Sequence, residues 1–115
     1  MISSRSSAET RLLCADAHTA DLEPDVADGP MPTSLAVLAD SPAGIGIWQA
    51  EPGTDVDVEA EELFVVLTGR GVVRFEDGSE LALAPGAVVQ LHAGDRTTWT
   101  ITEPLRKVYV TLPTG

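Results

Sequence analysis

The sequence predicts an all-β domain, a barrel or sandwich built from many short antiparallel strands. From Ser34 onward, short apolar runs recur at regular intervals, and Gly, Pro and Asp-Gly separate them. Those separators are typical of β-turns and hairpins, and no helical periodicity lies between them. The 115 residues are the usual length of one domain, so we expect a single core.

The expected domain has two unequal parts. Residues 1–33 form an N-terminal arm, with a stretch over residues 8–20 suited to a short helical turn or an edge strand, followed by the irregular, Pro-rich segment DLEPDVADGPMP. Residues 34–115 form the barrel. Its expected strands are SLAVLA, GIGIWQA, EELFVVLTG, GVVRFE, SELALA, AVVQLH, TTWTIT and RKVYVTL.

Two of these segments carry specific information. The EDG sequence at residues 76–78 is expected to close a tight hairpin, because glycine adopts positive φ without steric cost. The strand EELFVVL is apolar on both faces, and a small barrel can line only one of them with its own core. Leu63, Val65 and Leu67 therefore need cover from the arm or from a second subunit, and we expect a homodimer.

Composition excludes several classes of function. The net charge of −11 disfavours binding to nucleic acid and to anionic membrane surfaces, and it favours solubility or recruitment of a cationic partner. Cys14 is the only cysteine, which excludes an intrachain disulfide and fits a reducing compartment. No segment is apolar enough for a signal peptide or a membrane span, so we expect a cytoplasmic protein.

Five segments occur in a characteristic order, namely GIWQAEPG, EELFVVLTG, EDG, GDRTTW and EPLRKVY. Glu62 is followed by six residues and Gly69, and Gly86 is followed by five residues and HAG at residues 92–94. This pattern resembles the cupins, with motifs G-x5-H-x-H-x3,4-E-x6-G and G-x5-P-x-G-x2-H-x3-N. It is most similar to the branch grouped with (S)-ureidoglycine aminohydrolase. The resemblance implies a cupin jelly-roll barrel of two antiparallel sheets.

The cupin metal ligands are missing from this sequence. If four residues separate them from Glu62, the two histidines of the first motif fall on Asp55 and Asp57, and that of the second falls on Thr97. Transition metals usually require imidazole or thiolate ligands, so no such cofactor is expected. Asp55, Asp57 and Glu62 could instead hold a hard cation such as Mg or Ca, or the two aspartates could be solvated turn residues.

Strand alternation places the candidate polar residues. Glu62 shares a strand face with Phe64, and Lys107, the only lysine, shares one with Tyr109. The resemblance turns both faces into the barrel, where an unpaired carboxylate is costly. We expect a Glu62–Lys107 pair that is hydrogen-bonded by Tyr109. In the alternative, the Lys107 ammonium reaches solvent and Tyr109 packs in the core.

The remaining candidates are aromatic or isolated. Trp48 and Trp99, at positions that match the resemblance, pack as core or line the floor of a pocket. His92, at a strand end, is expected to be a hydrogen-bonded loop residue rather than a base. Cys14 is expected to be an inert thiol, since no basic residue is arranged beside it in sequence.

Two functions stay open. The first is a small-molecule-binding cupin, acting on a polar nitrogen-containing metabolite related to ureidoglycine, as the resemblance implies. The enzyme of that name uses Mn and a two-cupin chain, so its reaction is not carried over. If this chain performs chemistry, Glu62 would be the acid or base, Lys107 the partner of a carboxylate or oxyanion, and Tyr109 part of the same centre. Ligand binding would involve Trp48, Phe64, Thr97 and Trp99.

The second function is a non-catalytic ligand-sensing or dimerisation module with a degenerate metal site. The two hypotheses differ in what fills the barrel mouth. An open pocket lined by Glu62, Trp99, Lys107 and Tyr109 favours the first, and a barrel plugged by aromatic side chains favours the second.

Overall fold

A computed structural model describes residues 7–113 of the chain, and within that range all regular structure is β. Within these described residues, no helix is long and apolar enough to cross a membrane. The eight strands are β1 (Glu23–Val26), β2 (Thr33–Ala39), β3 (Gly44–Ala50), β4 (Gly53–Val58), β5 (Glu62–Phe75), β6 (Glu80–Leu83), β7 (Val88–Leu91) and β8 (Arg96–Thr111).

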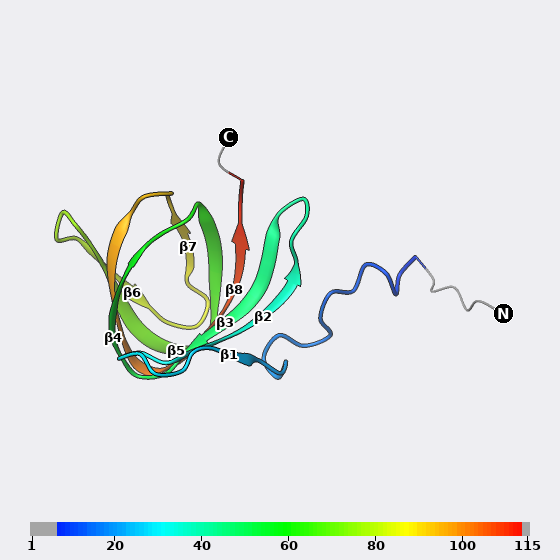
Figure 1. Ribbon diagram of the computed structural model, residues 1–115, viewed down its shortest axis with the longest axis horizontal. Helices are drawn as coiled ribbons and strands as arrows, with labels where there is room; N and C mark the ends of the chain where they lie inside the picture. Colours follow the sequence, from blue (N-terminus) through cyan, green and yellow to red (C-terminus); the bar gives the residue numbers. More distant parts are fainter. Residues whose placement is uncertain (1–6, 114–115) are drawn as a thin grey trace.

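The two longest strands, β5 and β8, organise the barrel. They pair antiparallel along their whole length, from Glu62 opposite Thr111 to Phe75 opposite Thr97. The first half of β5 also pairs with β7, and the adjoining half of β8 pairs with β3, which continues to β2 and β1. Their other halves pair with β6 and β4. The long strands thus pass from one sheet to the other and join them into a barrel (Figure 1), which confirms the predicted all-β jelly roll.

The bend in β5 depends on a glycine. Gly69 has φ +93, and the register of the β5–β8 pair shifts on either side of it. A Cβ at this position would collide with the backbone of Pro104 and Leu105 in β8. Only glycine combines this backbone conformation with so close an approach. Gly69 is therefore required at the point where β5 turns from one sheet into the other.

Alternation along the strands builds the core. On β8, Trp99, Ile101 and Leu105 are buried and point inward, and the residues between them are more exposed. Phe64 and Val66 of β5 join the same cluster. The predicted EDG hairpin is present, with Gly78 at φ +86 and the Phe75 N–H bonded to the Ser79 carbonyl.

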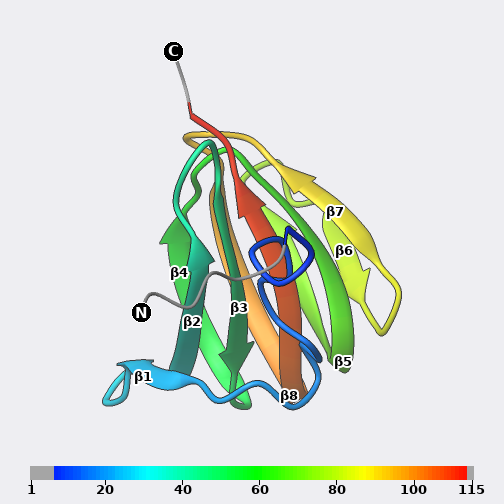
Figure 2. The ribbon, with the colours of Figure 1, turned by 90° about the vertical axis from the view of Figure 1, so that its right-hand side faces the viewer.

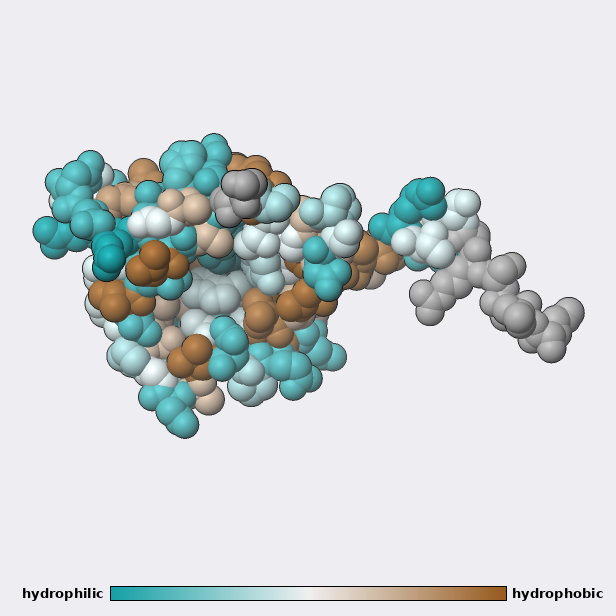
Figure 3. All heavy atoms as spheres, turned by 45° about the horizontal axis from the view of Figure 1, so that its top comes forward, coloured by the Kyte–Doolittle hydropathy of each residue, from teal (hydrophilic) through white to brown (hydrophobic). Residues whose placement is uncertain are grey.

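The arm is attached to the barrel along its second half, where Met31 joins the core cluster and the Pro32 carbonyl accepts from the Glu51 N–H at 2.9 Å. Residues 8–20 contain isolated turns, among them one closed by the Arg11 N–H and the Ala8 carbonyl at 3.1 Å, and no edge strand, and β1 adds to β2 at the edge of the sheet. Arg106 donates hydrogen bonds to the carbonyls of Ala17 and Ala20, at 2.9 and 3.0 Å. Residues 7–16 project away from the barrel (Figures 1 and 3), and Figure 3 also shows hydrophobic residues at the base of this segment.

Candidate functional site

A cavity of about 360 Å³ opens on one side of the barrel interior. Its lining comes from the arm, β2, β3, β4, β5 and β8, and includes Trp48, Glu62, Trp99, Lys107 and Tyr109. The cavity lies beside an aromatic cluster, in which the ring centroids of Trp48 and Phe64 are 5.5 and 5.7 Å from that of Trp99. This volume lies within the range of pockets that bind small metabolites.

Lys107 is the central cation of the cavity wall. Its Nζ donates to Glu62 Oε2 at 2.7 Å, and only 5% of the residue is exposed. Lys107 of β8 pairs with Val66 of β5, which lies two pleat repeats from Glu62 on the same inward face, and the two long side chains span that separation. The alternative position for Lys107, with its ammonium in solvent, is therefore wrong.

Three aromatic rings surround the ammonium. Lys107 Nζ lies 4.5 Å from the ring centroid of Trp48, 4.3 Å from that of Phe64 and 4.7 Å from that of Trp99. A cation over ring faces is stabilised by their quadrupoles, more strongly when water is excluded. The rings and Glu62 together compensate for the lost hydration of the ammonium. Phe64 lies behind Lys107 and, unlike the two tryptophans, does not line the cavity.

Tyr109 departs from the expected arrangement. It lines the cavity, but within residues 7–113 its hydroxyl makes no hydrogen bond to Glu62 or Lys107. Its ring lies across Gly46 of β3, where a Cβ would collide with the hydroxyl and the ring. Burial, followed by the negative charges of Glu62 and Asp25, raises the pKa of Tyr109. The phenol is therefore a proton-bearing hydrogen-bond donor at neutral pH.

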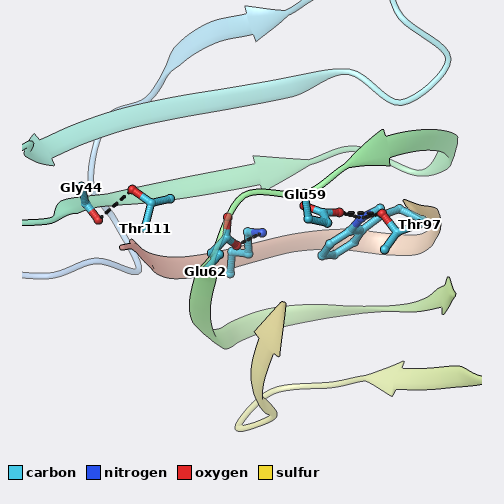
Figure 4. A network of polar contacts seen from close by, with 7 residues as sticks. Gly44, Glu59, Glu62, Thr97 and Thr111 are labelled. Atoms are coloured by element: carbon cyan, nitrogen blue, oxygen red, sulfur yellow. Dashed lines mark hydrogen bonds and ion pairs between the residues drawn. The ribbon is translucent and has the colours of Figure 1, made fainter. Parts of the chain in front are cut away.

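Sequence reasoning missed Glu59, a buried carboxylate in the same wall. Thr97 Oγ1 donates to its Oε2 at 2.6 Å, and Trp99 Nε1 donates to the same oxygen at 2.9 Å. Figure 4 shows Glu59 facing Thr97 at one end of β8, with Glu62 nearer the other end. Thr97 and Trp99, predicted as ligand-binding residues, thus hold Glu59, and Thr97 does not line the cavity.

The backbone fixes Glu59 at the end of β4. Its N–H donates to the Asp95 carbonyl at 2.8 Å, and its carbonyl accepts from the Gly94 N–H at 2.9 Å. A signal in the sequence could have found it, because counting the first cupin motif from Gly53 instead of Glu62 puts Glu59 at the first histidine position. The two ways of counting disagree, and only the three-dimensional structure shows that Glu59 is the buried one.

Burial determines the charge behaviour of Glu59. Desolvation raises the pKa of its carboxyl, and the nearby charge of Asp57 adds to this. The hydrogen bonds from Thr97 and Trp99 and the charge of Lys107 oppose the shift without cancelling it. Glu59 therefore accepts a proton more readily than an exposed glutamate does.

Asp55 and Asp57 lie on β4 and line the cavity with Asp25 of the arm. Their Oδ1 atoms accept from the backbone N–H groups of Val56 and Val58, at 2.8 Å each. Within residues 7–113, no three acidic, histidine or cysteine side chains are placed to hold a metal ion together. In this arrangement, Asp55, Asp57 and Glu62 line the same cavity without converging on one point.

The two isolated candidates lie away from the cavity. His92 Nδ1 is 2.9 Å from Glu61 Oε2, so His92 belongs to an exposed hydrogen-bonded turn, as expected. Cys14 is a half-buried free thiol of the arm.

The sequence model of the EutQ-like cupin domain matches residues 38–109. This range runs from the end of β2 to β8, so it includes the cavity-lining parts of β3, β4, β5 and β8, whereas Thr33 and Leu35 of β2 and the arm precede it. None of the curated proteins is similar enough to match.

Solved structures with the same architecture include the EutQ protein of Clostridium difficile, with a TM-score of 0.67 and 19% identity over 77% of this chain and 74% of that one. A DUF861-family protein from Thermotoga maritima is 30% identical, with a TM-score of 0.55, over 57% of this chain and 76% of that one. A DUF861-family protein of unknown function from Pseudomonas syringae is 27% identical, with a TM-score of 0.70, over 83% of this chain and 45% of that one.

Proposed function

Because the chain belongs to the family of EutQ-like cupin domains, we propose that its barrel binds a small polar metabolite in the cavity beside Lys107. The observation that carries this proposal is the cavity itself. It has a rigid aromatic wall, Trp48 and Trp99, and polar groups that converge on one space, which is the usual design of a ligand pocket.

The charge of the lining selects the class of ligand. Five carboxyl groups line the cavity against one ammonium, those of Asp25, Asp55, Asp57, Glu59 and Glu62. Lys107 already has its counter-ion in Glu62 and is enclosed by aromatic rings, so it is a poor partner for the carboxylate or oxyanion considered above. The ligand is therefore one rich in N–H donors or positively charged, such as an amine, amidine or ureido compound. Compounds related to ureidoglycine belong to this class.

Binding a donor-rich ligand assigns roles to the site residues. Asp55 and Asp57 attract it at the cavity opening, Trp48 and Trp99 supply a flat wall, and Tyr109 donates to a carbonyl of the ligand. If a reaction follows, Glu59 is the group suited to exchange a proton with the ligand, because burial raises the pKa of its carboxyl.

The ligand-sensing alternative is favoured by one observation. Glu62 and Lys107 neutralise each other at 2.7 Å, which leaves neither fully available as a base or an electrophile. Chemical change of a bound probe, followed by mass spectrometry, separates an enzyme from a sensor. A reducing, cytoplasmic setting suits either role, since Cys14 is a free thiol.

Calorimetry with three probes tests the ligand class. Agmatine presents an amine and a guanidinium group, methylurea presents an uncharged ureido group, and succinate is the anionic control. We expect agmatine to bind with a dissociation constant of about 1 mM or tighter and succinate not to bind. Asp57→Asn should weaken agmatine binding, whereas Asp40→Asn, an exposed site outside the cavity, should not. Tighter binding of succinate, or no binding of either nitrogen probe, contradicts the proposal.

A further inference from the structure

The segment from Asp25 to Thr33, called here the strap, supplies one wall of the cavity. Its residues Asp25, Val26, Met31 and Thr33 all line that space. Figures 1 and 2 show the strap across the lower end of the barrel, where β3 ends and β4 begins. The family model matches residues 38–109, so the strap lies outside the part of the chain that this model describes.

Close backbone contacts hold the strap against the start of β4. A Cβ at Gly53 would collide with the carbonyl of Pro30 and would press on the backbone of Met31. The Met31 side chain is 5% exposed and packs in the core cluster. The strap therefore closes the end of the barrel between β2 and β4, and a side chain at Gly53 would push it away.

Thr33 fixes the other end of the strap, although only 8% of this residue is exposed. Its hydroxyl accepts from the Val26 N–H at 3.2 Å and donates to Asp25 Oδ2 at 3.4 Å. The register of β1 and β2 shifts here, because Pro24 pairs with Ser34 and Val26 pairs with Thr33. Asp25 is thus the extra residue of a β-bulge, a feature that redirects side chains.

Asp25 is the carboxylate of the lining that is least engaged with other groups. Glu59 and Glu62 each accept side-chain hydrogen bonds of 2.9 Å or less. Asp55 and Asp57 each accept a backbone N–H at 2.8 Å. Asp25 has only the hydroxyl at 3.4 Å, and its Oδ1 accepts no hydrogen bond from residues 7–113. A ligand in the cavity therefore meets Asp25 as the most available acceptor.

We propose that Asp25 binds the cationic or N–H-rich group of the ligand directly, and that the strap holds Asp25 in place for this contact. The inference rests on the function proposed above and adds the contact that selects the ligand. Asp25 lies close enough to Tyr109 for its charge, after burial and the charge of Glu62, to raise the pKa of the phenol. A ligand with a cationic group beside a carbonyl or hydroxyl oxygen can bond to both side chains at once.

Calorimetry with agmatine tests the contact with Asp25. Asp25→Asn should weaken binding at least about fivefold, because a charge-assisted hydrogen bond is lost, and it should weaken binding more than Asp57→Asn. The matched control is Asp28→Asn, which removes the same charge from an exposed residue of the strap that does not line the cavity. Unchanged affinity in Asp25→Asn, or equal weakening in Asp28→Asn, would overturn this inference and leave the proposed function standing. A wild type that does not bind agmatine would contradict both.

A second pair of variants tests the role of Thr33. Thr33→Val keeps the shape of the side chain but removes the hydroxyl that bonds to Asp25 and to the Val26 N–H. It should weaken agmatine binding, and Thr33→Ser, which keeps the hydroxyl, should bind agmatine more tightly than Thr33→Val. Equal affinity in the two variants would mean that the hydroxyl does not position Asp25.

Acrylamide quenching of tryptophan fluorescence tests the strap without any ligand. Trp48 and Trp99 are the two tryptophans of the chain, and both line the cavity. Gly53→Ala should displace the strap and raise the quenching constant. The control is Gly78→Ala, at another glycine of positive φ, where an added Cβ meets nothing within 4 Å. Circular dichroism would establish that both variants are folded. A folded Gly53→Ala variant that is quenched no more than Gly78→Ala would show that the strap does not close the cavity.

Discussion

Two buried glutamates in one cavity wall are stabilised by different kinds of partner. Glu62 has a cation at 2.7 Å, whereas Glu59 has only the neutral donors Thr97 and Trp99. A buried carboxylate needs compensation for lost hydration, and the two kinds of partner differ in what they allow. The charge pair depends on both members, whereas the hydrogen-bonded carboxylate can also take up a proton. The difference shows how one wall can combine a fixed charge with a titratable group.

The largest expected effect comes from breaking the charge pair. Lys107→Met removes the counter-ion of Glu62 and the cation from three aromatic rings. Loss of one member of a buried pair costs about 3 kcal/mol in the free energy of unfolding. Chemical denaturation measures it, and Glu62→Gln combined with Lys107→Met should recover part of the loss. A Lys107→Met variant as stable as wild type would mean that the pair contributes nothing.

The pH dependence of stability distinguishes Glu59 from Glu62 further. The raised pKa of Glu59 means that the folded state binds its proton more tightly than the unfolded state, so this group favours folding at low pH. That contribution is lost as pH rises from about 4.5 through the folded pKa. Melting temperatures across this window should therefore fall less steeply with rising pH, or rise more, in Glu59→Gln than in wild type.

Glu61 provides the opposite sign as a control. The backbone N–H of Ala93, and then His92, lower the pKa of this exposed carboxyl. Its contribution is present above the unfolded pKa and is lost as pH falls through the folded pKa. Glu61→Gln should consequently change the pH dependence in the direction opposite to Glu59→Gln. The same direction in both variants would contradict the assignment of Glu59 as the buried titratable group.

The smallest effect is expected from an ion pair without burial. Arg70 and Glu103 are 3.7 Å apart and both are 61% exposed, so solvent screens their attraction. Arg70→Ala should change the free energy of unfolding by less than about 0.5 kcal/mol in the same denaturation assay. A loss as large as that of Lys107→Met would mean that burial is not what separates these pairs.

The sequence alone predicted more of the barrel than of the cavity. Strand alternation and turn chemistry are local, so the fold and the hairpin at residues 76–78 could be predicted. The pairing of Glu62 with Lys107 followed from their inward faces and from Lys107 being the only lysine. Tyr109 shares that face. The position of its ring, however, depends on the space that Gly46 leaves because glycine has no side chain, and strand alternation does not predict that position.

Glu59 and Asp25 could not be predicted for a different reason. The segment DVDVEAEE offers five acidic residues within eight positions, and nothing local says which of them is buried. Burial of Glu59 arises from the contact of its backbone with the turn at residues 94–95, far along the chain. Asp25 reaches the cavity because β1 of the arm adds to β2, a pairing that the irregular sequence does not indicate.

The enclosure of Lys107 also determines how the chain responds to amine-directed chemistry. Its ammonium is the only side-chain amine in the sequence, and the rings of Trp48, Phe64 and Trp99 close around it. Acetyl, methyl or ubiquitin groups are attached to lysines that an enzyme can reach, and here no such side chain is presented. The barrel is in this respect insulated from the commonest lysine modifications, and succinimide dyes or lysine cross-linkers should leave its side chains unlabelled as long as it stays folded.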